Sequence, residues 1–374
     1  VETCRVLELG CGNGSNLIAQ AYLLPDATFV GVDLAKGHIE DAAAAAAELG
    51  LKNVKFRQMD VTEMTSGDFG TFDYITAHGL FSWVPDAVRL CVLELYGELL
   101  NENGVGYVSY MAYPGAHQRE MVQRAMRFHT RSIDDPAEKV GKAMSFLNFL
   151  TSATPDRGVY QAVLKHELAR QMAREAEDIY HDDLSDLNRA FYFKEFAEML
   201  DANGLQYLAE AELHAMGTGG LPPEARSFVD SLDDVVEREQ YLDLLRGRIF
   251  RQTLFCRKGS ELARRVESGS LDGMLVSSSL RPQSDRLDLS SEKIERFVGP
   301  NNAGIEIDRP LAKAALAYLG GVWGRAVPFA ELVKTATSMI GETPADAERE
   351  TEILRMILLQ IATASSMVEL HVHQ

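Results

Sequence analysis

The feature that most constrains the fold is a short apolar strand that runs directly into a glycine-rich turn. An apolar run at residues 5–9 is followed by glycines at alternate positions, Gly10, Gly12 and Gly14, and an apolar-periodic helix begins near Asn16. Glycine permits a tight turn with positive φ and the close approach of a ligand, and the next helix offers unpaired N–H groups at its N-terminus. The sequence therefore predicts a strand, turn and helix that together bind a ligand.

The residues around the glycines indicate which ligand this is. A dinucleotide fingerprint, G-x-G-x-x-G, would need its third glycine where this chain has Ser15. Glu8 stands just before the glycines, where it would repel a pyrophosphate but could hydrogen-bond an ammonium group. S-adenosylmethionine carries an amino-acid head and a sulfonium rather than a diphosphate. We therefore expect S-adenosylmethionine at this turn.

The next expected strand supplies a candidate for binding the ribose. Residues 28–32 are apolar, and the strand ends at Asp33 and Leu34, about 20 residues after the glycines. A carboxylate at that position can accept hydrogen bonds from both ribose hydroxyls. The alternative is that Asp33 only caps a helix or lies in a solvated loop.

A third expected strand supplies a candidate for binding the adenine. Residues 53–58 form the strand, which ends at Met59, Asp60 and Val61. Asp60 is placed to accept a hydrogen bond from the adenine amino group, and Met59 or Val61 to cover the ring. Ligands of parallel sheets sit at the carboxyl ends of the strands, so the three strand ends predict one site.

These three segments resemble motif I, the acidic loop and the adenine loop of class I methyltransferases, and the resemblance covers roughly the first 260 residues. It implies that S-adenosylmethionine is the cofactor and S-adenosylhomocysteine the product. The expected cofactor-binding residues are Glu8, Gly10, Gly12, Gly14, Asn16, Asp33, Leu34, Met59, Asp60, Val61, His78 and Gly79.

Length and charge exclude several other classes of protein. A chain of 374 residues, 46% of them hydrophobic, is long enough for two or three domains. It has no apolar run of the roughly 18–20 residues needed to span a bilayer, so we expect no membrane insertion. The net charge of −18 argues against a nucleic-acid partner, because phosphate contacts need clustered Lys and Arg. An acidic enzyme could instead attract basic protein substrates.

Cysteine usage indicates a reducing compartment. The four cysteines are scattered and form no C-x-x-C pair, which predicts reduced thiols in a cytoplasmic protein with neither a disulfide framework nor a metal site. The chain starts at Val1 and enters its first strand within about five residues, so we expect that an N-terminal piece is missing from it.

The pattern of elements predicts an α/β protein with a Rossmann-like, seven-stranded sheet and a second, mainly helical domain. We expect a methyltransferase domain over residues 1–258, interrupted by a helical insertion at about 116–190 and a second excursion at about 212–249. A linker is expected at 259–300, in which residues 268–286 form either part of the linker or short strands, and a winged-helix-like domain is expected at 301–374. The methyltransferase resemblance further implies that the seventh strand is antiparallel and lies at the end of the sheet.

The C-terminal domain is expected to have three helices, at 309–319, 328–340 and 348–364, and a short terminal strand at 367–372. Residues 301–374 contain more Asp and Glu than Lys and Arg, which argues against a DNA-reading role and favours protein contact or substrate recognition.

The loop after the fourth strand, residues 78–85, is expected to face the transferred methyl group. It contains His78, Phe81 and Trp83 but lacks the Asn/Asp-Pro-Pro-Tyr sequence that often accompanies methylation of nucleobases or glutamine. His78 could contact the cofactor, act as a base or hydrogen-bond its own loop. Phe81 and Trp83 could line an acceptor channel or simply pack against the following helix.

Four segments together are similar to a bacterial family of methyltransferases that carry a methyltransferase regulatory domain. This family includes protein-lysine methyltransferases acting on outer-membrane surface proteins. The segments are the loop at 78–85, the Tyr-Pro-Gly loop at 113–115, and residues 180–184 and 251–254. The chain departs from the family where Met111 and Ala112 replace Asn-Thr and where His181-Asp182-Asp183 replaces a His-Glu-Tyr-type sequence.

Methyl transfer from a sulfonium is an in-line displacement, so the protein mainly positions donor and acceptor and excludes water. The leading hypothesis is a cytoplasmic methyltransferase acting on protein lysines, with His78, Trp83 and Tyr113 as candidate catalytic residues. A small-molecule methyltransferase and a non-catalytic S-adenosylmethionine-binding module are the alternatives. The sequence leaves the oligomeric state open.

Overall fold

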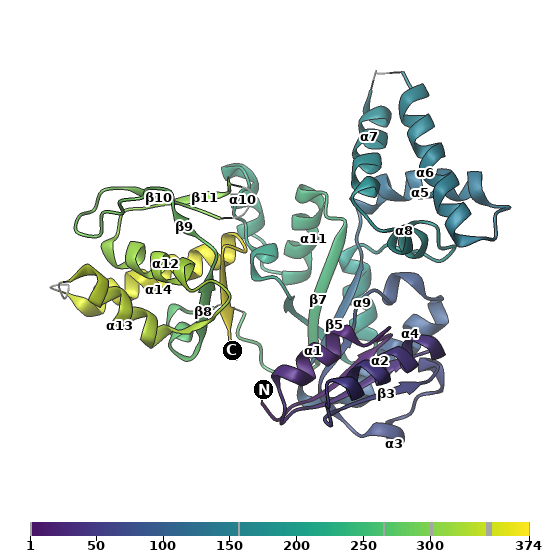
Figure 1. Ribbon diagram of the computed structural model, residues 1–374, viewed down its shortest axis with the longest axis horizontal. Coiled ribbons are helices and arrows are strands. Elements are labelled where there is room, and N and C mark those ends of the chain that lie inside the picture. Colours follow the sequence, from purple (N-terminus) through teal and green to yellow (C-terminus); the bar gives the residue numbers. More distant parts are fainter. Residues whose placement is uncertain (1, 156–157, 265, 300–301, 342–345, 374) are drawn as a thin grey trace. The chain divides into compact units, whose positions relative to one another are not determined.

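The computed structural model describes residues 2–155, 158–264, 266–299, 302–341 and 346–373, and the chain forms two compact units (Figure 1). The larger unit consists of Glu2–Ala211 and Phe228–Ser260. The smaller unit consists of Glu212–Ser227 and Glu261–Gln374. The expectation about the chain start concerns Val1 and what precedes it, which lie outside the described residues.

The larger unit is built on a seven-stranded sheet in the order β3-β2-β1-β4-β5-β7-β6. All neighbouring pairs from β3 to β5 are parallel, and β7 is antiparallel to both β5 and β6. The strands are β1 (Arg5–Leu9), β2 (Thr28–Asp33), β3 (Val54–Gln58), β4 (Phe72–Ala77), β5 (Leu100–Met111), β6 (Leu205–Glu210) and β7 (Phe250–Arg257).

The expected antiparallel direction of β7 is confirmed, but its expected place at the end of the sheet is wrong. The edge strand is β6, and β7 lies between β5 and β6. Thr253 and Phe255 on β7 are fully buried, which a position between two strands allows and an edge position would make difficult.

Helices cover both faces of the sheet, as a doubly wound fold requires. On β1, Val6 packs into the core beneath α1 (Ser15–Leu23) and α2 (Lys36–Glu48), whereas Leu7 and Leu9 pack into the core beneath α4 (Asp86–Leu99) and α9 (Phe193–Ala202). The other helices of this unit are η1 (Val61–Glu63), α3 (Ser66–Phe69), η2 (Phe81–Trp83) and α11 (Val235–Arg246), and α10 (Pro223–Asp230) spans the boundary between the two units in the sequence.

The insertion between β5 and α9 is helical and has a core of its own. Its helices form one group in Figure 1 and bury the apolar side chains of Val122, Met126, Leu147 and Leu164, among others. These helices are α5 (Ala116–Thr130), α6 (Pro136–Ala153), α7 (Val159–Met172) and α8 (Ala176–Asp183).

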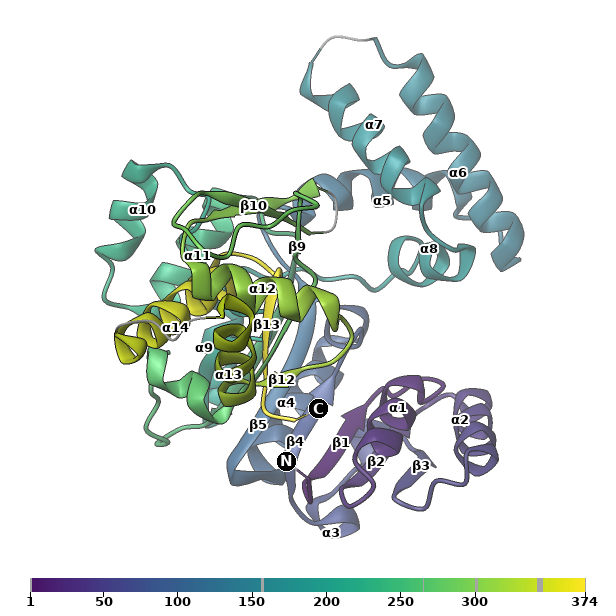
Figure 2. The same ribbon diagram turned by 60° about the vertical axis from the view of Figure 1, so that its left-hand side comes forward.

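The smaller unit contains the three expected helices and the expected terminal strand around a separate apolar core (Figure 2). Two three-stranded sheets, ordered β11-β10-β9 and β12-β8-β13, accompany them. The elements are η3 (Leu213–Met216), η4 (Ser268–Gly273), β8 (Leu275–Ser278), β9 (Arg281–Pro282), β10 (Glu295–Val298), β11 (Gly304–Ile307), α12 (Pro310–Gly321), β12 (Val327–Pro328), α13 (Phe329–Ile340), α14 (Ala347–Ala364) and β13 (Val368–His371).

Within residues 259–300 the structure has short strands, the alternative at residues 268–286, in place of a linker. This segment supplies β8, the central strand of one small sheet, and both β9 and β10 of the other. Val276 and Phe297 are fully buried in the core of the smaller unit. The second excursion is likewise divided, because Glu212–Ser227 belongs to the smaller unit. The winged-helix likeness stays a prediction.

Candidate active site

The glycine turn has the conformation that its sequence predicts. Gly10, Gly12 and Gly14 have φ values of 71°, 53° and 73°, in the left-handed region that favours glycine. A Cβ on Gly14 would come within 2.6 Å of the Phe56 ring, whereas a Cβ on Gly12 would meet nothing within 4 Å. Gly14 is therefore required for packing, and Gly12 leaves open space beside the backbone.

Asp33 at the end of β2 holds the glycine turn in place. One of its carboxylate oxygens accepts a hydrogen bond of 2.9 Å from the Gly12 N–H, and the other accepts one of 2.8 Å from the Ala35 N–H. The side chain thus has a structural role in the turn. Two carboxylate oxygens offer about four lone-pair positions, so ribose binding by Asp33 stays a prediction.

Glu8, at the other side of the turn, is a buried carboxylate that is only half satisfied. One oxygen accepts a hydrogen bond of 2.9 Å from the Asn16 amide, and the other has no hydrogen-bond partner among the described residues. Burial raises the pKa of Glu8 to about 7, since desolvation disfavours the charged form. A buried oxygen without a partner is costly, and an ammonium group bound beside it would satisfy it.

A cavity of about 580 Å³ opens beside this turn. It brings together five of the predicted site residues: Glu8, Gly10, Gly12, Asn16 and His78. The other residues that line it are Cys11, Ser15, Gln20, Thr76, Tyr107 and Gln252.

Two of these other lining residues, Tyr107 and Gln252, form a hydrogen-bonded chain with His78. His78 follows β4, Tyr107 lies on β5 and Gln252 on β7, three neighbouring strands of the sheet. The Tyr107 hydroxyl lies 2.7 Å from Nδ1 of His78 and donates a hydrogen bond of 3.0 Å to Oε1 of Gln252. The site therefore draws on residues separated by 145 positions, which sequence reasoning did not connect.

The predicted adenine residues lie at the end of β3 and do not line the cavity. Asp60 is half-buried, and one of its oxygens accepts hydrogen bonds from the backbone N–H and the hydroxyl of Thr62. These two hydrogen bonds lower the pKa of Asp60. Met59 and Val61 pack partly against the core, and Leu34 is exposed. Their contacts with adenine stay predictions.

The loop after β4 is held by buried polar contacts. Gly79, with φ of 66°, donates its N–H to the Ser109 hydroxyl at 2.9 Å. Phe81 is fully buried against Phe191 and Phe196, so of the two alternatives for this residue the structure agrees with packing in the core and not with an acceptor channel.

Trp83 and Tyr113, the other two candidate catalytic residues, lie outside the lining of this cavity. The ring centroid of Trp83 is 5.7 Å from that of His181, and its indole nitrogen is buried without a partner among the described residues. Tyr113 stacks on His117, with ring centroids 4.0 Å apart. Both side chains are partly buried against one small apolar cluster around Met111.

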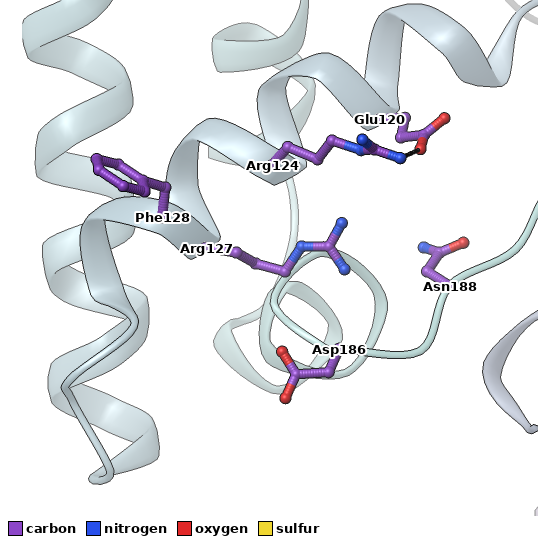
Figure 3. A pocket seen from close by; sticks show the side chains of 6 residues that line it. All are labelled: Glu120, Arg124, Arg127, Phe128, Asp186 and Asn188. Carbon is purple, nitrogen blue, oxygen red and sulfur yellow. Dashed lines mark hydrogen bonds and ion pairs between the residues drawn. The ribbon is translucent and has the colours of Figure 1, made fainter.

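The Tyr113 hydroxyl donates a hydrogen bond of 3.1 Å to Glu120 on α5. Burial, and then the neighbouring Glu120 carboxylate, raise the pKa of Tyr113 to about 12, so the phenol stays protonated at neutral pH. Glu120 also accepts a hydrogen bond from Arg124, which Figure 3 shows pointing toward it. Tyr113 is thereby tied to the helical insertion.

Glu120 and Arg124 also line a second cavity, of about 500 Å³, on the insertion (Figure 3). Both of its arginines already have partners, because Arg124 pairs with Glu120 and Arg127 donates to the Ser185 carbonyl oxygen at 2.6 Å. This cavity therefore offers no evident anion site.

Residues 180–184, one of the segments behind the family resemblance, anchor the insertion. Asp183 is buried and accepts hydrogen bonds from the guanidinium groups of Arg119, Arg170 and Arg174. Although burial acts in the opposite direction, these cations lower the pKa of Asp183 to about 2. Asp183 thus stabilises the insertion as a charged group.

Within the described parts of the chain, no three His, Cys, Asp or Glu side chains are arranged to hold a metal ion. The four cysteines are all free thiols. None of the described helices combines the length and apolarity needed to cross a membrane.

Comparisons with known proteins agree with this geometry. A family model described as a methyltransferase domain matches residues 1–176, and one described as a predicted methyltransferase regulatory domain matches residues 175–257. The second segment contains β6 and β7, so the regulatory-domain segment completes the sheet and supplies Gln252 to the cavity.

Relatives and solved structures match over different lengths. The solved structure of PKMT2 from Rickettsia typhi in complex with AdoHcy has a TM-score of 0.88 and 28% identity, and covers 99% of this chain and 72% of that one. An uncharacterized protein of Rickettsia prowazekii is 31% identical over 92% of this chain, which spans only 63% of that protein. Trans-aconitate 2-methyltransferase of Deinococcus radiodurans is 32% identical over 34% of this chain and 45% of its own length.

The sheet, the glycine turn and the cavity at the strand ends define a class I S-adenosylmethionine-dependent methyltransferase. The chain belongs to the bacterial methyltransferase family whose members carry a methyltransferase regulatory domain.

Proposed function

We propose that the protein transfers the methyl group of S-adenosylmethionine to lysine amines of a protein substrate in the cytoplasm. The choice of acceptor rests on the likeness to PKMT2, whose name stands for a protein-lysine methyltransferase. This likeness covers 99% of the chain and so includes both units. The likeness to trans-aconitate 2-methyltransferase covers only 34% of the chain.

The residues around the cavity fit the cofactor. The unsatisfied oxygen of Glu8 suits the ammonium group of the amino-acid head, and the open space at Gly12 lets a ligand approach the backbone. In this proposal Asp33 binds the ribose hydroxyls, while Asp60, Met59 and Val61 hold the adenine. Leu34 and Gly79 contribute backbone contacts to the same ligand.

When bound, S-adenosylmethionine supplies a methyl group activated by a positively charged sulfur. A neutral lysine amine forms the new N–C bond, and the S–C bond breaks with its electron pair remaining on sulfur. The first product is an N-methylammonium ion, which can then lose a proton to water. The protein's task is to orient the amine and exclude water. His78, Trp83 and Tyr113 are our candidates for this task.

A small-molecule acceptor is the second candidate, and the observation that favours it is the likeness to trans-aconitate 2-methyltransferase over 34% of this chain. A non-catalytic binding module is the third, because an intact cofactor site does not by itself require turnover.

Incubation of the protein with methyl-labelled S-adenosylmethionine and fractionated bacterial lysate separates these candidates. We expect label in protein, and methyl-lysine after acid hydrolysis and mass spectrometry. Label in small molecules alone would support the second candidate. Binding of the cofactor by calorimetry without label in either fraction would support the third.

A further inference from the structure

The chain of His78, Tyr107 and Gln252 has a defined direction, which follows from what each group can donate. The side-chain carbonyl oxygen of Gln252 can only accept, so the single hydroxyl proton of Tyr107 is committed to it at 3.0 Å. The same hydroxyl lies 2.7 Å from Nδ1 of His78 and can only accept there. With Oε1 of Gln252 facing the hydroxyl, Nδ1 of His78 carries the ring proton.

This arrangement leaves Nε2 of neutral His78 with a free lone pair. Burial lowers the pKa of His78, and the opposing effect of Asp182 is smaller, so the ring is neutral at pH 7. A neutral imidazole protonated on Nδ1 is an acceptor at Nε2, whereas the other tautomer would present an N–H donor. The tautomer thus decides what His78 offers on the cavity that it lines.

We infer that Tyr107 and Gln252 are positioning residues that hold His78 in the Nδ1–H tautomer, so that its Nε2 accepts a hydrogen bond from the methyl-accepting amine. The inference rests on the proposed function, in which the acceptor is a lysine amine. An amine attacks through its lone pair, so fixing one of its N–H bonds on Nε2 limits the directions in which that lone pair can point. The opposite tautomer would present an Nε2–H, which could only donate to the lone pair of the amine and so occupy the electrons needed for attack.

The backbone of Gln252 is held in place by Glu210 and by the pairing of β7. Its backbone N–H donates a hydrogen bond of 3.2 Å to Glu210, which is buried and also accepts hydrogen bonds from Arg251 and Thr253. Because β7 is paired on both sides, the side chain of Gln252 extends from a rigid backbone. The position of the acceptor oxygen is therefore fixed by the sheet.

The tautomer can be measured without any substrate. In protein carrying ¹⁵N-labelled histidine, long-range ¹H–¹⁵N spectra distinguish protonated from unprotonated ring nitrogens, and the His78→Gln variant identifies the signals of His78. We expect the Nδ1–H form in the wild type at pH 7.5, and loss of this preference in Tyr107→Phe and Gln252→Leu. Gln252→Glu retains an acceptor oxygen and should retain the tautomer.

The control is Tyr96→Phe, which likewise deletes one tyrosine hydroxyl, in this case from a fully buried side chain. Tyr96 donates a hydrogen bond of 2.7 Å to the backbone carbonyl oxygen of Tyr107. Loss of this hydrogen bond destabilises β5 but leaves the hydrogen bonds among the side chains of His78, Tyr107 and Gln252 in place. We expect this variant to lower the melting temperature but keep the Nδ1–H form.

Turnover on lysine then tests the role of the tautomer. We expect Tyr107→Phe to lower kcat by at least about tenfold while the dissociation constant for S-adenosylmethionine stays within about twofold. An Nε2–H tautomer in the wild type, or an unchanged kcat in Tyr107→Phe, would overturn the inference. If the wild type methylates no amine at all, the proposed function fails, and the inferred role of His78 toward an amine fails with it even where the tautomer is as expected.

Discussion

The Asn16 amide donates a hydrogen bond of 2.9 Å to one oxygen of the Glu8 carboxylate, while the other oxygen is buried without a partner among the described residues. Glu8 lies on β1 and Asn16 in the first turn of α1, so the pair spans the glycine turn. In the free protein this carboxylate is held at a cost in stability, and a bound ammonium group would offset that cost. Two predictions concern this pair.

The first prediction is that Glu8→Gln stabilises the ligand-free protein at high pH. The pKa of Glu8 is raised in the folded state from 4.5 to about 7, so the folded state binds the proton more tightly than the unfolded state does. Stability therefore falls as pH rises from 4.5 to 7, by about 3 kcal/mol in total, and the glutamine avoids this loss. Urea unfolding at pH 4 and pH 8.5 should show the variant's advantage only at pH 8.5.

The control for this experiment is Glu48→Gln on α2, since Glu48 is exposed. Its effect on the free energy of unfolding should be small and the same at both pH values. An advantage of Glu8→Gln that did not grow with pH would contradict the prediction.

The second prediction is that cofactor affinity depends on the ionisation of Glu8. With a pKa of about 7, the carboxylate is mostly protonated at pH 6 and mostly charged at pH 8. Calorimetric titration with S-adenosylmethionine should therefore give a dissociation constant about tenfold lower at pH 8 than at pH 6. In Glu8→Gln this pH dependence should be absent and the binding weaker at pH 8. Equal pH dependence in both proteins would rule out Glu8 as the partner of the ammonium group.

The third prediction separates two glycines of the same turn. Gly12→Ala and Gly14→Ala both place a side chain at positive φ, which costs about 1–2 kcal/mol. Only Gly14→Ala also brings a Cβ within 2.6 Å of Phe56 and 2.8 Å of the Ala42 Cβ. We expect Gly14→Ala to lower the free energy of unfolding the more, and Gly12→Ala to weaken cofactor binding more than its loss of stability explains. Equal loss of stability in both variants would contradict this assignment.

Much of the larger unit could be predicted from sequence because its signals are local. The strand-turn-helix around Gly12 and the apolar strands that follow depend on short-range patterns, and the three strand ends lie where these patterns place them. The neighbours of β7 could not be predicted in this way, because β5, β6 and β7 are far apart in the chain and periodicity carries no information on strand order.

The site residues that sequence reasoning missed, Tyr107 and Gln252, were missed for the same reason: their contacts depend on the order of the strands. Tyr107 meets His78 and Gln252 only through the pairing of β4, β5 and β7. His78 could be predicted from its loop, but Tyr107 and Gln252 do not stand out in their own strands. The signal that could have drawn attention to Gln252 was its place in the Arg-Gln-Thr-Leu segment behind the family resemblance. Residues 259–300 looked like a linker because β8, β9 and β10 have only two to four residues each, too few for a clear alternation.

The fourth prediction concerns Tyr113 on the acceptor side. Its hydroxyl donates to Glu120, and its pKa of about 12 keeps it protonated at neutral pH, so it acts as a hydrogen-bond donor and never as a base. We expect Tyr113→Phe to lower kcat for lysine methylation by about tenfold while the dissociation constant for S-adenosylmethionine is unchanged. Loss of the hydrogen bond should cost only about 1 kcal/mol of stability.

Two further variants show whether this effect is specific to Tyr113. Tyr160→Phe removes the hydroxyl of an exposed tyrosine on α7 and should leave kcat unchanged. Glu120→Gln keeps an acceptor oxygen for the Tyr113 hydroxyl but removes the negative charge that helps to raise its pKa, and should retain most of the turnover. If Tyr113→Phe matched the wild type in single-turnover assays with cofactor bound, Tyr113 would have no part in orienting the amine, and its contact with Glu120 would serve only to tie the loop after β5 to the insertion.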